Sequence, residues 1–291
     1  MTTMKAFITR CPAATYFALT FAISWGGVLL VIGGPGKIPG TTEQAERLLP
    51  FVVLAMLPGP AVAGLLLTGL VHGKAGLRDL LSRMLRWRVG GRWYAVALVG
   101  APVLVTAVLL ALSLTSPAFL PGIYTSDDKA TILLISIAYG LGAGFFEELG
   151  WTGFAVPRLR LRHGVLATGL IVGILWGVWH FITNFWGSGN SSGALSLAAF
   201  LPAQLFAVGA LPAYRVLMVW VYDRTGSLLV AMLMHASFTA SWLIVMPVGI
   251  SGVPFLTWYL VWTAALWVIV AAVAVANGWH LSRQPLRTPM A

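Results

Sequence analysis

Charged residues are scarce in this sequence. Asp, Glu, Lys and Arg make up 9% of its 291 residues, whereas about 25% is usual in soluble proteins. Hydrophobic residues make up 59%, and the mean hydropathy is +0.89. This composition excludes an ordinary soluble globular protein. It predicts an all-α polytopic membrane protein, because most of the chain has to lie in lipid and helices satisfy their own backbone hydrogen bonds there.

Cysteine and several catalytic motifs are also nearly or wholly missing. The single cysteine, Cys11, excludes an internal disulfide, and we expect it to be an inert thiol. H-E-x-x-H does not occur, which excludes the zincin motif. Ser237 lies two residues from His235 and hence on another helix face. Asp223, beside Arg224, is the only acid after residue 148, so an aspartate dyad is excluded.

Eight apolar segments are long enough to cross a bilayer core of about 30 Å, which needs about 20 helical residues. The predicted spans are 13–32, 51–71, 93–115, 130–151, 165–184, 197–221, 226–246 and 255–276. The sequence has no convincing internal repeat. We therefore expect a single integral membrane domain over residues 1–291, with the first helix uncleaved.

The basic residues lie in alternate loops and predict the orientation of the chain. One set of loops and termini holds 15 of the 18 Lys and Arg residues, and the positive-inside rule places this set in the cytoplasm. Eight spans with both termini cytoplasmic fit this distribution. The net charge of +10 is then a topology signal, and we expect membrane lipids and no nucleic acid as partners. The predicted location is the bacterial plasma membrane.

Residues 76–88, GLRDLLSRMLRWR, have the pattern of an amphipathic helix. Apolar residues recur at i, i+3, i+4 and i+7, with arginines on the other face. The preferred interpretation is a connector that lies on the inner leaflet, and the alternative is a docking surface for substrate.

Few ionisable residues lie inside the spans, and such residues are functional candidates. They are Glu147 and Glu148 in the fourth span, His180 in the fifth and His235 in the seventh. Arg215 is close enough to a cytoplasmic end to be interpreted as a snorkelling side chain. The other histidines are interpreted as ordinary interfacial residues: His72, His163 and His280.

The two carboxylates and two imidazoles are suited to activating or orienting a water molecule, or to binding a metal. Adjacent helical residues point about 100° apart, so Glu147 and Glu148 should have different roles. The alternative interpretation of the pair is a buried structural brace. Small residues predict close helix packing nearby; they are Gly140, Gly144, Gly169, Gly173 and Gly177.

Depth is the difficulty for such a site. With straight ideal spans, Glu147 and His180 would differ in depth by more than about 10 Å. We therefore expect that the fourth helix extends past residue 151 and that the fifth helix starts after residue 165. A structure that keeps these residues apart would exclude catalysis.

Three short motifs in order resemble those of the CPBP intramembrane proteases, which include the CAAX prenyl protease type 2 enzymes and bacteriocin-immunity homologues. The family motif E-E-x-x-x-R is matched by Glu147 and Glu148, with Thr152 in place of Arg. An aromatic residue, three positions and His match WGVWH, which ends at His180. His, three positions and Asn or Asp match HASFT from His235, with Thr239 in place of Asn or Asp. The resemblance covers about residues 130–245.

The resemblance implies a role for each matched residue. Glu147 would be the general base that activates water, with Glu148 supporting it. His180 and His235 would hold that water or, together with Glu147, a divalent metal such as zinc. Thr239 would stand where the family places a side chain that stabilises the oxyanion. The substitutions at Thr152 and Thr239 put the environment of the carboxylate and one oxyanion donor in doubt.

The predicted function is an intramembrane endopeptidase that hydrolyses a peptide bond of an unidentified peptide or protein near the cytoplasmic face. Two alternatives stay open. A weak or inactive member would act as an immunity or scaffold protein by binding, which the two threonine substitutions favour. A proton-coupled transporter would need polar sites along a path across the whole bilayer.

Overall fold

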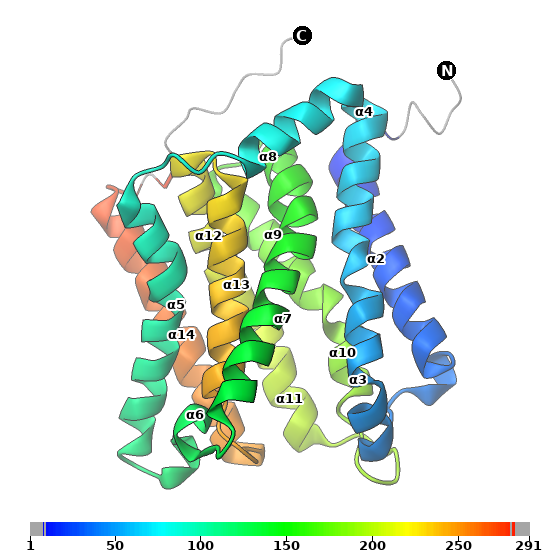
Figure 1. Cartoon of the computed structure of the whole chain (residues 1–291), viewed down its shortest axis with the longest axis vertical. Coiled ribbons are helices and arrows are strands. Elements are labelled where there is room, and N and C mark those ends of the chain that lie inside the picture. Colours follow the sequence, from blue (N-terminus) through cyan, green and yellow to red (C-terminus); the bar gives the residue numbers. More distant parts are fainter. Residues whose placement is uncertain (1–7, 9, 280, 283–291) are drawn as a thin grey trace.

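The computed structural model describes residues 8, 10–279, 281 and 282, and these form a bundle of helices (Figure 1). Eight of the helices are long and apolar enough to cross a membrane, which confirms the predicted all-α polytopic class. Lys5, His280, Arg283 and Arg287 lie outside the described residues. The cytoplasmic placement of the termini stays a prediction.

The predicted spans agree closely with the observed ones. The long helical stretches run over Pro12–Ile32, Thr42–Met84, Gly91–Ser113, Lys129–Leu159, Val165–Trp186, Leu197–Thr225, Leu228–Val245 and Gly252–Ala276. Their helices are α2 (Pro12–Ile32), α3 (Thr42–Met56), α4 (Pro58–Met84), α5 (Gly91–Ser113), α7 (Lys129–Gly150), α8 (Val156–Leu159), α9 (Val165–Trp179), α10 (Phe181–Trp186), α11 (Leu197–Leu205), α12 (Leu211–Thr225), α13 (Leu228–Val245) and α14 (Gly252–Ala276), with the short α6 (Gly122–Thr125) in a loop.

Two spans contain an inserted π-helical turn. Trp151–Ala155 joins α7 to α8, and Phe206–Ala210 joins α11 to α12. Such turns are rare and are frequent at functional sites. The first one directly follows Glu147 and Glu148, and it extends the fourth span to Leu159.

The segment 76–88 is helical only as far as Met84, where α4 ends. Within α4, before this segment, Gly73 kinks the helix with φ 60° and ψ −151°, a backbone conformation that favours glycine. The last turns of α4 cross one end of the bundle (Figure 1). Leu80 is buried, whereas Leu77 and Leu81 are exposed.

Glycines let the helices that carry the candidate residues approach one another closely, as predicted. A Cβ atom at Gly140 or Gly144 of α7 would come within 2.4 Å of a backbone oxygen of α13, that of Ala236 or Met232. α7 packs more extensively against α13 than against any other helix. This contact places the last turn of α7 beside His235.

α9 and α12 form a second close pair. A Cβ atom at Gly169 or Gly173 of α9 would come within 2.6 Å of backbone atoms of Val216 or Pro212. Backbones that approach this closely need small residues at the contact. The pair brings Arg215 of α12 towards the centre of the bundle.

Candidate active site

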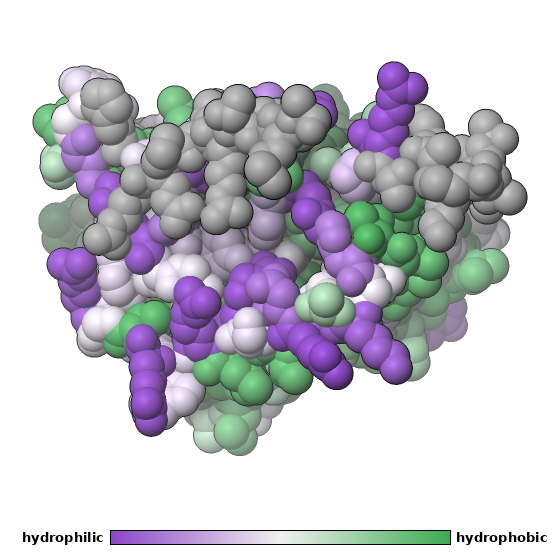
Figure 2. Space-filling view, turned by 90° about the horizontal axis from the view of Figure 1, so that it is seen from above, coloured by the Kyte–Doolittle hydropathy of each residue, from purple (hydrophilic) through white to green (hydrophobic). Residues whose placement is uncertain are grey.

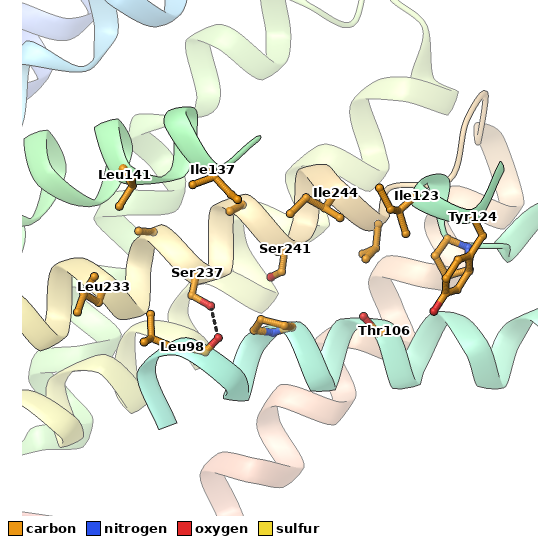
Figure 3. Close-up of a pocket in the computed structure, with 15 residues that line it drawn as sticks. Leu98, Thr106, Ile123, Tyr124, Ile137, Leu141, Leu233, Ser237, Ser241 and Ile244 are labelled. Atoms are coloured by element: carbon orange, nitrogen blue, oxygen red, sulfur yellow. Dashed lines mark hydrogen bonds between the residues drawn. The ribbon is translucent and has the colours of Figure 1, made fainter. Parts of the chain in front are cut away.

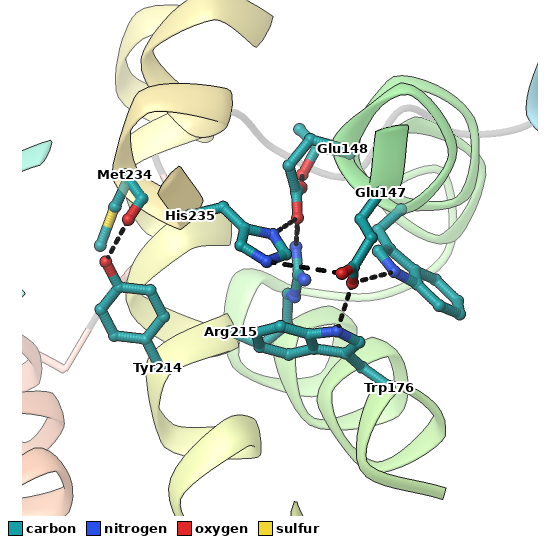
Figure 4. A network of polar contacts seen from close by, with 9 residues as sticks. Glu147, Glu148, Trp176, Tyr214, Arg215, Met234 and His235 are labelled. Atoms are coloured by element: carbon teal, nitrogen blue, oxygen red, sulfur yellow. Dashed lines mark hydrogen bonds and ion pairs between the residues drawn. The ribbon is translucent and has the colours of Figure 1, made fainter. Parts of the chain in front are cut away.

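Glu147 and Glu148 lie in the last turn of α7 and are both buried, with 4% and 0% of their surface exposed. They face different partners, as the helical geometry predicted. Figure 4 shows Glu147 directed towards Trp176 and Glu148 towards Arg215, with His235 between the two carboxylates. One site thus receives side chains from α7, α9, α12 and α13.

Glu148 is held by three side chains. Nη1 of Arg215 donates to both of its carboxylate oxygens, at 2.9 and 2.8 Å. The hydroxyl of Thr152 donates to Oε2. Nδ1 of His235 lies 2.6 Å from Oε1. A buried charge needs this degree of pairing to stay ionised in a medium of low dielectric constant.

The interpretation of Arg215 as a snorkelling side chain was wrong. Its side chain is fully buried, and its guanidinium lies 4.3 Å from the ring centroid of Trp176. The span continues to Thr225, so Arg215 lies ten residues from the end, at a depth of about 15 Å. At that depth Glu148 is a nearer partner than the bilayer surface.

Arg215 also removes the doubt raised by Thr152. The family motif places an arginine one turn after the second glutamate, and here that position carries a hydroxyl that donates to Glu148. The cationic donor comes instead from another helix, 67 residues along the chain. A pair formed between two helices leaves no periodic pattern in the sequence. Two other signals were present in the sequence: an arginine inside a predicted span, and the absence of the arginine from the first motif.

Glu147 is oriented by two indoles. Its Oε2 accepts a hydrogen bond of 2.7 Å from Nε1 of Trp176 and one of 3.3 Å from Nε1 of Trp151. Its Oε1 lies 3.8 Å from Nε2 of His235, which is too long for a direct hydrogen bond. Trp176 is the aromatic residue of the second motif, so this motif supplies a donor as well as a ring.

The imidazole of His235 is clamped between the two glutamates. A carboxylate paired with arginine can only accept, so Nδ1 of His235 donates to Glu148. In the neutral ring Nε2 is then an acceptor, and it faces Oε1 of Glu147. Glu148 therefore sets the tautomer of the histidine that faces the other glutamate.

His180 belongs to the same cluster but is held differently. It follows α9 directly, and its Nδ1 lies 2.8 Å from the carbonyl oxygen of Trp176. Its ring meets Trp176 and Trp179 edge-to-face, at 5.9 and 4.9 Å between centroids. Within the part of the chain that the structure describes, His180 makes no hydrogen bond to either glutamate.

The extension of the fourth helix alone removes the expected difference in depth between Glu147 and His180. The fourth helix does extend, and Leu159 ends it twelve residues after Glu147, about 18 Å away. The fifth helix starts at Val165 and no later, so that half of the expectation was wrong. His180 lies fifteen residues, or about 22 Å, from that start. The two depths therefore agree to within about 5 Å.

Thr239 lies one turn after His235 on α13 and is half-buried. Among the described residues, no hydrogen bond involves its side chain. Its hydroxyl lies on the same helix as His235, and its role as an oxyanion donor stays a prediction.

Tyr16 of α2 is a neighbour of the site that the sequence analysis missed. It is fully buried, and its ring lies 5.6 Å from that of Trp151. Its hydroxyl would be 2.3 Å from a Cβ atom at Gly150. Nothing in the local pattern of α2 distinguishes Tyr16 from a membrane-facing aromatic residue.

The divalent metal site that the resemblance implies at Glu147, His180 and His235 stays a prediction. Over the described ranges, no group of three or more His, Cys, Asp or Glu side chains is arranged to hold a metal ion. The Nδ1 atoms of His235 and His180 face Glu148 and a backbone carbonyl. The Nε2 atom of His235 is directed at Glu147 across 3.8 Å.

Ser237 is not part of this site. Its hydroxyl donates to the carbonyl oxygen of Leu98 at 2.9 Å, in an apolar pocket of about 410 Å³ between α5, α7 and α13 (Figure 3). The sequence analysis predicted that Ser237 and His235 lie on different faces of their helix. The structure agrees, because Ser237 faces α5 and His235 faces the glutamates.

Comparisons with known proteins show what the segment that carries this site is similar to. Residues 129–241 match the model of the Type II CAAX prenyl endopeptidase Rce1-like family. The "CAAX prenyl protease 2" of Methanococcus maripaludis is 23% identical to the chain over 172 residues, which are 57% of this chain and 60% of that protein. The match thus spans about three fifths of the relative's length. The segment 129–241 contains Glu147, Glu148, His180, His235 and Thr239. These matches confirm the resemblance to the CPBP intramembrane proteases that the three motifs indicated.

Proposed function

We propose that the chain is an intramembrane endopeptidase in which Glu147 activates the attacking water. The observation that carries this proposal is the pair of facing acceptors, Oε1 of Glu147 and Nε2 of His235, 3.8 Å apart in a buried site. Two acceptors repel each other unless a donor lies between them. A water molecule can donate one O–H to each, and contacts longer than about 3.5 Å are often bridged in this way.

Hydrolysis then needs only the side chains of the cluster. Glu147 takes a proton from the water as its oxygen attacks the scissile carbonyl carbon, and returns that proton to the leaving amine nitrogen. The hydroxyl group stays on the carbonyl carbon as the peptide bond breaks. The two indoles hold the second oxygen of Glu147, so that the first one faces the water.

The other residues of the cluster position the reacting groups. Glu148, paired with Arg215, keeps Nδ1 of His235 protonated and Nε2 free to accept. The Trp176 carbonyl does the same for Nδ1 of His180, so Nε2 of this ring is likewise left free to accept a hydrogen bond. Thr239 would supply a hydrogen bond to the oxyanion.

The proposed substrate is a peptide or protein that reaches the site from the basic, cytoplasmic end of the bundle. The relative from Methanococcus maripaludis is named a CAAX prenyl protease. For this chain we propose peptide-bond hydrolysis in the bacterial plasma membrane without requiring a prenyl group. We prefer hydrolysis to the transporter alternative because the buried charged side chains of the described spans all belong to this one cluster: Glu147, Glu148, Arg215 and His235.

The deciding experiment compares Glu147→Gln with wild-type protein in cleavage of a fluorogenic peptide library by the detergent-purified chain. Loss of a general base typically costs about 10²–10⁴ in rate, and we expect a loss of at least about a hundredfold. Glu43→Gln, at an exposed glutamate, is the matched control and should retain full activity. If wild-type protein and Glu147→Gln bind the same peptides equally and neither cleaves them, the chain is a binding member of the family and the proposal is wrong.

A further inference from the structure

A second polar pocket lies at the end of the bundle that carries most of the arginines. Its volume is about 460 Å³, within the range of about 300–1,000 Å³ that is usual for ligand sites. It lies between the last turns of α4, the π-helical turn before α8, and the end of α12. Its polar lining includes His72, Asp79, Arg83, Arg158 and Tyr222. Figure 2 shows hydrophilic residues gathered over this end, with hydrophobic residues at the margin.

Arg158 differs from Arg83 and Arg160 because it has no carboxylate partner within the described part of the chain. Arg83 pairs with Asp79 at 2.9 Å, and Arg160 pairs with Asp223 at 2.6 Å. The two pairs neutralise the charges beside the pocket. The charge of Arg158 is not balanced by such a pair.

The contacts of Arg158 do not neutralise it. Its Nη2 donates to Nε2 of His72, and its guanidinium lies 5.3 Å from the ring centroid of Phe154. Its Nε is buried and has no hydrogen-bond partner. A buried donor without an acceptor is costly, and a guanidinium donates its strongest hydrogen bonds to an anionic oxygen. An anionic oxygen on the Arg158 side of the pocket would pair this charge.

The surroundings indicate where that anion comes from. The last turns of α4, which form one wall of the pocket, present Leu77 and Leu81 outwards, as an amphipathic helix does at a membrane surface. Basic pockets between spans at the cytoplasmic side bind the headgroups of anionic lipids. A lipid whose phosphate faces Arg158 would lay its acyl chains along these exposed leucines.

We propose that this pocket binds the phosphate headgroup of an anionic phospholipid, with Arg158 as the principal phosphate donor. The end of α4 is then both a connector and one wall of a lipid site. The proposal does not depend on peptide hydrolysis, because no residue of the pocket belongs to the cluster around Glu147. It adds a specific lipid to the general membrane environment of the protein.

The test is native mass spectrometry of the full chain in detergent micelles, titrated with phosphatidylglycerol, with phosphatidylcholine or with inorganic phosphate. We expect one tightly bound phosphatidylglycerol, and at least tenfold weaker binding in Arg158→Gln. The matched control is Arg162→Gln, which removes the same charge from an exposed position in the same loop. It should weaken binding by no more than about fivefold, the general effect of one basic residue near an anionic surface.

A second variant leaves the charges in place. Ala75 lines the pocket on α4, and Ala75→Met should fill it and reduce phosphatidylglycerol binding without changing the melting temperature of lipid-free protein. Equal losses in Arg158→Gln and Arg162→Gln, or equal binding of phosphatidylcholine, would overturn the proposal. Saturation by inorganic phosphate alone, dependent on Arg158, would show an anion site but overturn the lipid source.

Discussion

The centre of the bundle and its basic end both contain arginine–carboxylate pairs, but the two regions use them differently. In the centre, Arg215 and Glu148 are fully buried, and His235 and Thr152 complete the network. At the basic end, Arg83 pairs with Asp79, whose side chain is 64% exposed. Water screens the second pair and is excluded from the first. In this protein the burial of an arginine–carboxylate pair, and not the distance between its atoms, therefore decides how much the pair contributes to stability.

The largest effect should follow from Arg215→Met, which breaks the central pair. Removing one partner of a buried ion pair leaves an uncompensated charge and typically costs about 3–5 kcal/mol. We expect a loss of this size in the free energy of unfolding, measured by denaturant titration in mild detergent micelles. Hydrolysis should be lost with it, because His235 is no longer held in one tautomer.

The double variant Arg215→Met with Thr152→Arg sharpens this prediction. It returns an arginine to the motif position one turn after Glu148, where it can pair with the same carboxylate. We expect partial recovery of both stability and hydrolysis. A double variant that is stable but still inactive would show that Arg215 contributes to the reaction in a way that a second arginine cannot replace.

A smaller effect should follow from Trp176→Phe, which removes the 2.7 Å hydrogen bond to Glu147 and keeps a ring beside Arg215. Hydrogen bonds to charged groups contribute about 1.5–3 kcal/mol. We expect a fall in kcat of about ten- to a hundredfold, which corresponds to that range, with KM little changed. A matched Trp258→Phe change, at a buried tryptophan of α14, should leave kcat unaltered.

The basic end should give the smallest change in stability. Asp79→Asn removes an exposed partner, and exposed pairs contribute about 0–1 kcal/mol. We expect the free energy of unfolding to fall by less than about 1 kcal/mol, in the same denaturant titration. A loss as large as that of Arg215→Met would contradict the contrast between the two regions.

Metal removal should have no effect on hydrolysis if the central cluster works through its side chains alone. The described residues form no three-ligand group, so we expect dialysis against a chelator to leave the rate unchanged. Loss of activity that zinc restores would instead favour the divalent metal allowed by the family resemblance.

The sequence alone determined the spans and the candidate residues. Span length follows from a local property, the number of consecutive apolar residues needed to cross the bilayer core. All eight long helices of the described chain correspond to predicted spans. The divergence of Glu147 and Glu148 was also predictable, because adjacent residues on any helix point about 100° apart. The order of the three motifs was sufficient to recognise the resemblance to the family.

Only the tertiary structure decided which groups meet. The partner of Glu148 is an arginine 67 residues away, and close packing of α9 against α12 carries it to the centre of the bundle. The depth of Glu147 relative to His180 depended on the π-helical turn Trp151–Ala155, which no periodicity in the sequence announced. Hydropathy and helical spacing are properties of one segment, whereas the pairing of buried charges depends on how several helices pack against one another.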